Sequence, residues 1–243
     1  AGPGAAPAAA TPDDGPATAG EGADPAPSPE EGEPTAPARE SLVTVVWGPT
    51  GAPGRTTVAV NLAAEHAMAG RNTLLVDLDT YGPAVGVHLG LTEESAGVAR
   101  AVRRADHGRL GAADLAAAGV RVRVAGADLT VLTGLTRVDR WPELRPAAVS
   151  ALIAAAREHW DRVVVDVGFG LEQDEELSFD VPAPQRNGAT LAALAAADEV
   201  IAVGGPDAVA LPRLVRGVEE LAEAAPAARL LVVVNRLRPA AAR

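Results

Sequence analysis

Residues 42–79 read LVTVVWGPTGAPGRTTVAVNLAAEHAMAGRNTLLVDLD, and this stretch predicts the fold of the chain. A run of β-branched and apolar residues, Val43–Trp47, leads into a turn rich in glycine and proline, and a helical segment follows that ends at Gly70. A second apolar run, Thr73–Leu78, is followed by Asp79. The order strand, glycine-rich loop, helix, strand is typical of P-loop proteins, in which glycines let the backbone curl around a phosphate and the positive end of the helix faces the anion.

The loop and the segment after it resemble the MinD/ParA group of P-loop ATPases, whose loop usually reads GKGGxGKTT. The resemblance rests on PTGAPGRTT at residues 49–57 and on VNLAAEHAMAGRNTLLVDLD at residues 60–79. Within this group the chain is most similar to the CpaE/TadZ branch and related actinobacterial MinD-like proteins, where the loop is often degenerate. The resemblance runs from about Leu42 to the end of the chain. It implies an α/β fold with a doubly wound, mainly parallel sheet and helices on both faces.

The resemblance also implies which residues bind ATP and Mg²⁺. The nucleotide-binding residues are expected to be Gly51, Ala52, Gly54, Arg55, Thr56, Thr57, Gly170 and Asn235, and the metal-binding residues Thr56, Asp79 and Asp166. Asp166 ends the apolar run 162–166 and matches the Walker B pattern of the family. Asp79 inherits the catalytic role of positioning the attacking water. Taken alone, Asp79 would be read as part of an ordinary turn at a strand end; after a P-loop, the functional interpretation is favoured.

Four residues of the loop depart from the family pattern. Pro49 stands where the family has its first glycine, and Thr50 stands where it has the lysine that reaches across a dimer to the partner's nucleotide. Pro53 removes one backbone donor, and Arg55 replaces the lysine that binds the terminal phosphates. Arg186 is our candidate for a compensating cation. These departures predict very low ATP hydrolysis.

Composition limits the remaining possibilities. All 21 basic residues are arginine, and the chain has no cysteine, which excludes disulfides and sites built on cysteine. The sequence shows neither a signal peptide nor an apolar run of membrane-spanning length, which predicts a cytoplasmic protein without direct membrane insertion. The net charge of −11 disfavours nucleic acid as a partner.

Residues 1–40 are expected to form a disordered acidic linker that is rich in proline and alanine. They carry eight acidic residues against one arginine and contain no aromatic or large aliphatic residue, so they cannot bury enough apolar surface to fold. The P-loop ATPase-like domain is expected to occupy residues 41–243. The chain begins without a methionine, and in CpaE-like relatives a receiver-like domain precedes the ATPase domain, so we expect this sequence to be a piece of a longer protein.

The rest of the chain alternates helices and strands. We expect helices at 56–69, at 93–119 in two pieces broken near Gly108, from Pro142 to about His159, at 189–197 and at 208–224. Further strands are expected at 128–132, 162–166, 199–203 and 229–234. The arginines of 93–119 favour a solvated helix face over a DNA-binding patch, because no aromatic residues are interleaved with them. Residues 171–188 carry acids whose spacing fits no metal-binding loop, and we interpret them as a solvated or partner-facing switch segment.

Three classes of function are open at this point. The first is an ATP-dependent switch that forms a homodimer and recruits protein partners for cellular positioning or for assembly of a pilus or secretion machine. The second is a pseudo-ATPase scaffold that binds partners but binds nucleotide weakly or not at all. The third is a P-loop enzyme acting on a small metabolite, for which the sequence shows no substrate-specific motif. The intact Thr56, Asp79, Asp166 and Asn235 favour the first class; the four departures favour the second.

Overall fold

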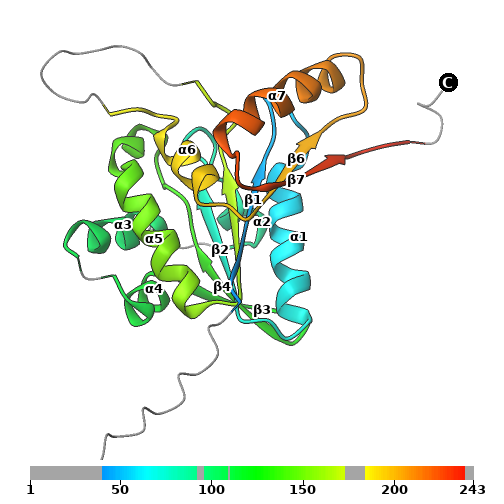
Figure 1. The fold of residues 1–243 in the computed structure, drawn as a ribbon. Helices are drawn as coiled ribbons and strands as arrows, with labels where there is room; N and C mark the ends of the chain where they lie inside the picture. Colours follow the sequence, from blue (N-terminus) through cyan, green and yellow to red (C-terminus); the bar gives the residue numbers. More distant parts are fainter. Residues whose placement is uncertain (1–39, 92–95, 109, 173–183, 239–243) are drawn as a thin grey trace, which may run out of the picture. The chain divides into compact units, whose positions relative to one another are not determined.

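A computed structural model describes residues 40–91, 96–108, 110–172 and 184–238. In this part of the chain, seven strands form one sheet in the order β3-β4-β2-β5-β1-β6-β7 (Figure 1). Every neighbouring pair is parallel except β3 and β4, which form an antiparallel hairpin at one edge. The chain therefore has the expected doubly wound, mainly parallel α/β fold. The disorder expected for the N-terminal linker concerns residues outside the described part.

The bounds of the elements, in chain order, are β1 (Leu42–Trp47), α1 (Arg55–Met68), β2 (Thr73–Leu78), α2 (Val85–His88), α3 (Gly97–Asp106), α4 (Ala112–Ala118), β3 (Val120–Val124), β4 (Ala127–Leu132), a 3₁₀ turn (Val138–Glu143), α5 (Pro146–His159), β5 (Arg162–Val167), α6 (Gly188–Ala195), β6 (Glu199–Gly204), α7 (Ala210–Ala224) and β7 (Arg229–Val234). The four central strands are almost wholly buried, since helices cover both faces of the sheet; this is why they read as continuous apolar runs rather than as alternating ones.

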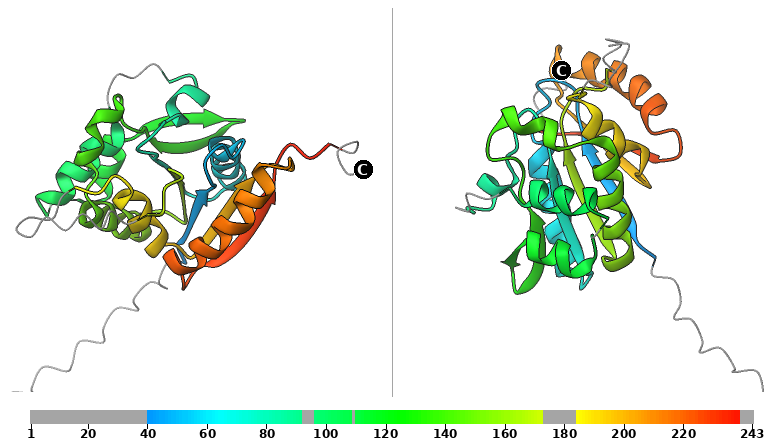
Figure 2. Two further views of the ribbon diagram at one scale, coloured as in Figure 1. Left: turned by 90° about the horizontal axis from the view of Figure 1, so that it is seen from above. Right: turned by 90° about the vertical axis from the view of Figure 1, so that its left-hand side faces the viewer.

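The two faces of the sheet have separate hydrophobic cores. On one face, small side chains of α1, Ala59, Ala63 and Ala67, pack closely on β2 and β5, and Val85 of α2 joins them. On the other face, α3 to α7 supply a larger core that contains Leu152 and other big aliphatic side chains. Figures 1 and 2 show α1 on one side of the sheet and α5 on the other. Among the described residues, no helix combines the length and the apolarity that a membrane span requires.

Most expected elements are present within two residues of their expected ends, and three expectations were incomplete or wrong. The strand β3 and the short helix α2 were not expected at all. Pro142 does not open the long helix: it lies inside the 3₁₀ turn, and α5 begins at Pro146, whose fixed φ suits the first turn of a helix. Either proline could have opened a helix, but the apolar face of α5 begins directly after Pro146 and not after Pro142.

Candidate nucleotide-binding site

The expected site residues meet where the central parallel strands end. Val46 of β1 pairs in register with Asp166 of β5, and Asp166 in turn pairs with Asp77 of β2. Strands β1 and β5 are adjacent in the sheet. The carboxyl edge of β1, β2 and β5 therefore brings together the glycine-rich loop after β1, the acidic turn after β2 and the loop after β5. Ligands of open α/β sheets bind at this edge.

The loop after β1 curls in spite of its two prolines. Gly51 and Gly54 have φ values of 79° and 84°, which residues with a side chain rarely adopt. The N–H of Ala52 donates to the carbonyl oxygen of Pro49 over 2.9 Å and closes a turn, and Arg213 of α7 donates to the carbonyl oxygen of Thr50 over 3.2 Å. The backbone path of the loop thus depends on glycine positions that the departures leave intact.

The loop passes directly into the N-terminus of α1. Gly54 is the N-cap of this helix and, as a glycine, offers no side-chain acceptor to the N–H groups of the first turn. The positive end of a helix favours an anion. Thr57 follows in the first turn and is exposed; its carbonyl oxygen accepts a hydrogen bond of 2.7 Å from Asn61. Asn235, at the end of β7, donates to the carbonyl oxygen of Pro53 over 3.0 Å. Asn235 therefore supports the loop in this structure.

Arg55, the first residue of α1, is bound to both sides of the site. Its Nη1 donates to the carbonyl oxygen of Gly48 over 3.0 Å, and its Nη2 contacts Oδ2 of Asp79 at 3.2 Å. The other carboxylate oxygen of Asp79 accepts hydrogen bonds from the N–H groups of Tyr81, at 2.8 Å, and Gly82, at 3.1 Å. Both oxygens of Asp79 are consequently engaged, one by its own turn and one by Arg55.

Asp166 has the opposite environment. It is 1% exposed, and neither of its carboxylate oxygens has a hydrogen-bond partner among the described residues. Burial raises the pKa of Asp166, and the Thr56 hydroxyl and the Arg55 guanidinium oppose that rise. The Thr56 hydroxyl thus lies close enough to stabilise the charged form of Asp166, although the geometry between the two groups is not that of a normal hydrogen bond. A buried carboxylate without partners costs free energy, so its presence calls for a ligand.

Asp77, on β2 two residues before Asp79, is a buried acceptor of hydrogen bonds. Its oxygens accept hydrogen bonds from the N–H of Asp79, at 3.2 Å, and from the N–H of Val85, at 3.0 Å, so it ties the turn to α2. Burial, with a contribution from the Asp166 charge, raises the pKa of Asp77 to about 8. Gly134 makes room for this carboxyl group: a Cβ atom there would lie 2.7 Å from Cγ of Asp77. Sequence reasoning missed Gly134, although its place after a strand was a usable signal.

The turn after β2 is joined to the chain after β5 by contacts of Tyr81. Its ring lies 4.5 Å from the ring of Phe169, and the guanidinium of Arg186 lies 4.0 Å from the Tyr81 ring centroid. The Tyr81 hydroxyl group donates to Oδ1 of Asn187 over 2.7 Å, and the same oxygen would be 2.3 Å from a Cβ atom at Gly170. We call Tyr81, Phe169, Arg186 and Asn187 the aromatic junction.

Arg186 was our candidate for a compensating cation. In the structure its guanidinium lies in the aromatic junction, over the Tyr81 ring. Besides stacking on Tyr81, Arg186 donates from Nη2 to the carbonyl oxygen of Thr80 over 3.0 Å, while its own carbonyl oxygen accepts from the Thr80 hydroxyl. Most of the switch segment proposed from the sequence, residues 173–183, lies outside the described part of the chain.

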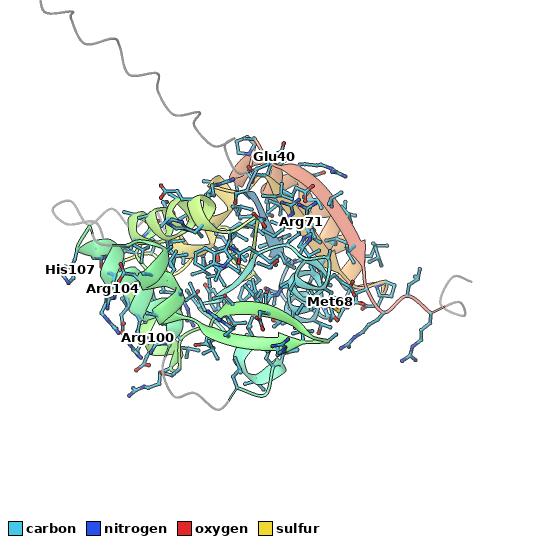
Figure 3. The ribbon with its side chains drawn as sticks, turned by 90° about the horizontal axis from the view of Figure 1, so that it is seen from below. Glu40, Met68, Arg71, Arg100, Arg104 and His107 are labelled. Carbon is cyan, nitrogen blue, oxygen red and sulfur yellow. The ribbon has the colours of Figure 1, made fainter. Side chains whose placement is uncertain are left out.

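The arginines of α3 are remote in sequence from the phosphate loop. Figure 3 labels two of them, Arg100 and Arg104, at the periphery of the molecule. Each is engaged within the protein: Arg100 donates to the carbonyl oxygen of Ala118 over 2.7 Å, Arg103 pairs with Glu143 at 3.1 Å, and Arg104 pairs with Asp114 at 2.5 Å. Paired arginines without interleaved aromatic residues are what a solvated helix face requires, and they give no support to a nucleic-acid surface.

The residues present fit a bound phosphate and a hydrated metal ion. The uncapped start of α1 and the curled loop offer backbone donors to an anion, and Thr56 and Asp166 offer oxygens of the kind that Mg²⁺ prefers. Among the described residues, no cluster of three or more His, Asp or Glu side chains could hold a metal ion by itself. A metal ion would therefore need ligands from water or from the bound phosphates.

No protein-family model matches the chain, and no curated protein matches it. Solved structures do match it. The cell division ATPase MinD from Pyrococcus furiosus has a TM-score of 0.61 at 19% identity, over 83% of this chain and 77% of that chain. A ParA family ATPase from Chlorobium tepidum has a TM-score of 0.63 at 19% identity, over 81% and 74%. The septum site-determining protein MinD from Pyrococcus horikoshii, complexed with Mg-ADP, has a TM-score of 0.59 at 19% identity, over 83% and 75%. The chain thus has the fold of the MinD and ParA ATPases.

Proposed function

We propose that this chain is a nucleotide-dependent switch of the MinD/ParA type, in the CpaE/TadZ-like branch. It binds ATP and Mg²⁺ at the carboxyl edge of the sheet and hydrolyses ATP very slowly. Its nucleotide-bound form is a homodimer that recruits protein partners of a positioning, pilus or secretion system in the cytoplasm. The fold, the uncapped start of α1 and the acidic edge support this function.

The observation that carries the proposal is the unpartnered carboxylate of Asp166. It is buried at the end of β5, beside the Thr56 hydroxyl, in a molecule whose other acids at this edge are satisfied by hydrogen bonds. Leaving a buried carboxylate unpaired is unfavourable, and a water ligand of Mg²⁺ would supply the missing donors.

The chain's own residues then have distinct tasks. The backbone of Gly51 to Gly54 and the start of α1 hold the phosphates, and Arg55 contributes a positive charge. Thr56 and Asp166 would hold the metal ion, and Asp79 would orient the attacking water. The metal ion would neutralise charge on the terminal phosphates. Asn235 would hold the adenine edge, as the family resemblance implies, if it leaves the carbonyl oxygen of Pro53.

Calorimetric titration tests the binding step. We expect the unmodified chain to bind ADP more tightly with Mg²⁺ than in EDTA, and we expect Thr56→Ala to weaken Mg·ADP binding roughly tenfold while leaving metal-free ADP binding nearly unchanged. Thr136→Ala, at an exposed position away from the loop, is the matched control. Equal losses with and without metal would place the Thr56 hydroxyl away from the ion.

Turnover should be close to background, because the loop lacks the charges that accelerate phosphoryl transfer. Thr50 supplies no charge, Pro53 has no N–H, and Arg186 is held in the aromatic junction. One missing trans-acting cation can cost roughly a thousandfold in rate. A phosphate-release assay checks this expectation. Steady hydrolysis on the order of one per second or faster would contradict it, and Arg186→Ala would then show whether that residue leaves the junction to take part.

The homodimer is tested by light scattering of the purified chain. We expect Mg·ATP to shift the chain from monomer to dimer, whereas Mg·ADP should not. The dimer should be long-lived, because Thr50 cannot supply the trans-acting charge and ATP is therefore hydrolysed slowly. A mass that is the same with either nucleotide would exclude the switch and leave a constitutive assembly.

A pseudo-ATPase scaffold is the second candidate function, and one observation favours it. Arg55 contacts the carboxylate of Asp79 and the carbonyl oxygen of Gly48, so groups of the protein itself engage the cation of the loop. Under this alternative the partner-facing surfaces are kept while nucleotide binds weakly or not at all. Titration with ATP and ADP separates the two functions directly.

A further inference from the structure

We propose that the ion pair between Arg55 and Asp79 is an internal lock on the phosphate loop, which an anionic ligand must open before it can bind tightly. The proposal rests on the function proposed above, since it concerns how that same site is regulated. It also makes a distinct claim: the carboxylate of Asp79 competes with phosphate for Arg55.

The position of Arg55 is the first argument for the lock. Its guanidinium group spans the site, from the carbonyl oxygen of Gly48 where the loop begins to the carboxylate of Asp79 where β2 ends. The Arg55 side chain is 18% exposed and that of Asp79 only 4%, so the pair is largely shielded from water. Shielded, charge-assisted hydrogen bonds are stronger than those of exposed surface pairs.

The rigidity of Asp79 is the second argument. Its Oδ1 accepts hydrogen bonds from the N–H groups of Tyr81 and Gly82, and Tyr81 is in turn fixed by Phe169 and Asn187 of the aromatic junction. These hydrogen bonds hold Asp79 in the turn, so moving it with Arg55 toward a ligand would require breaking them. A phosphate that takes the Arg55 charge must break the contact between Arg55 and Asp79 and leave the carboxylate without its cation.

Opening the lock has a consequence for the metal ion. Arg55 is bound to Asp79 at the edge of the sheet where Asp77 and Asp166 also lie. Once a phosphate draws Arg55 away, the acidic edge loses positive charge, and a divalent cation then restores the balance. We therefore infer an order of binding in which the anion comes first and Mg²⁺ follows, and Mg²⁺ alone should bind weakly.

The first test examines the ligand. Metal-free ADP is titrated calorimetrically in EDTA into the unmodified chain, into Asp79→Asn and into the control Asp128→Asn, an exposed acid on β4. Asparagine keeps an oxygen for the N–H groups of Tyr81 and Gly82 but removes the competing charge. We expect Asp79→Asn to bind ADP roughly tenfold more tightly than the unmodified chain and the control. Equal or weaker binding by Asp79→Asn would overturn the lock.

The second test examines the ion pair without any ligand. Unfolding equilibria of Arg55→Gln, Asp79→Asn and the double variant form a double-mutant cycle, and we expect a favourable coupling of roughly tenfold in the unfolding constant. Additive effects would overturn the lock whatever the titrations show. If coupling is present but none of the chains, including Asp79→Asn, binds ADP, the nucleotide-binding function is overturned, and with it the regulatory meaning of the pair.

Discussion

The phosphate loop and the turn that faces it are held in place by different means. The loop, residues 48–57, is shaped by its backbone: two glycines have positive φ, and its carbonyl oxygens accept hydrogen bonds from Arg213 and Asn235. The facing turn, residues 79–82, is held by side chains, through the Asp79 carboxylate and the Tyr81 ring.

This difference explains which substitutions each region tolerates. Pro49, Thr50, Pro53 and Arg55 replace residues of the family pattern, yet the loop keeps its curl, because none of them occupies a position where φ is positive. The backbone shape of a phosphate loop therefore does not depend on the charged side chains that catalysis requires. The facing turn is less tolerant at Asp79 and Tyr81, since the side chains of these two residues set its geometry.

The largest effect is expected from Gly48→Ala, at the start of the loop. A Cβ atom at Gly48 would lie 2.3 Å from the carbonyl oxygen of Val203 on β6, and backbone in a central sheet cannot move aside. We expect the free energy of unfolding to fall by about 3 kcal/mol in a denaturant titration. Gly82→Ala in the facing turn is the matched control, because nothing lies within 4 Å of its Cβ position. Similar losses at both positions would remove the distinction between the two regions.

Tyr81→Leu should have the next largest effect, in the facing turn. It removes the ring contact with Phe169, the stacking of Arg186 and the hydrogen bond to Asn187, and we expect it to lower the free energy of unfolding by about 2 kcal/mol. Tyr81→Phe keeps the ring and should cost about 1 kcal/mol. If the two variants were equally stable, the hydroxyl group alone would hold the turn.

The last prediction concerns the dependence of stability on pH and tests the buried acids that lie behind both regions. The raised pKa of Asp77 means that the native chain keeps a proton that the unfolded chain has released above about pH 4. Stability contributed by this group is therefore lost as pH rises from about 4 toward about 8, by roughly 1 kcal/mol per pH unit. Denaturant titrations at pH 5 and pH 7 measure the slope. Asp77→Asn should flatten it; an unchanged slope would assign it to another group.

The backbone of the site could be predicted from the sequence, and its side-chain contacts could not. The order of strand, glycine loop, helix and acidic strand end identifies which segments meet, because parallel strands present their carboxyl ends at one edge. The pair of Arg55 with Asp79 and the aromatic junction join residues far apart in the chain, and no local pattern specifies such contacts. Sequence reasoning therefore offered Arg186 as a compensating cation without access to its contacts with Tyr81 and Thr80.

The hairpin of β3 and β4 shows a different limit. Val120, Val122 and Val124 alternate with arginines, which is a usable strand signal. The turn between the two strands contains Ala125 with a φ of 47°, a conformation in which alanine is uncommon. Because the turn lacks asparagine or aspartate before its glycine, the usual hairpin signature was absent and the first strand was not expected.

Trp47 makes the site observable without any label. Its indole Nε1 donates to the carbonyl oxygen of Phe169 over 3.1 Å, its ring packs on Gly217 of α7, and the phosphate loop begins at the next residue. The emission of a buried indole shifts to longer wavelength when water reaches it. Replacing Trp141 and Trp160 by phenylalanine would leave Trp47 as the single tryptophan of the chain, and its emission spectrum would then report movement of the loop after β5 relative to the phosphate loop in real time.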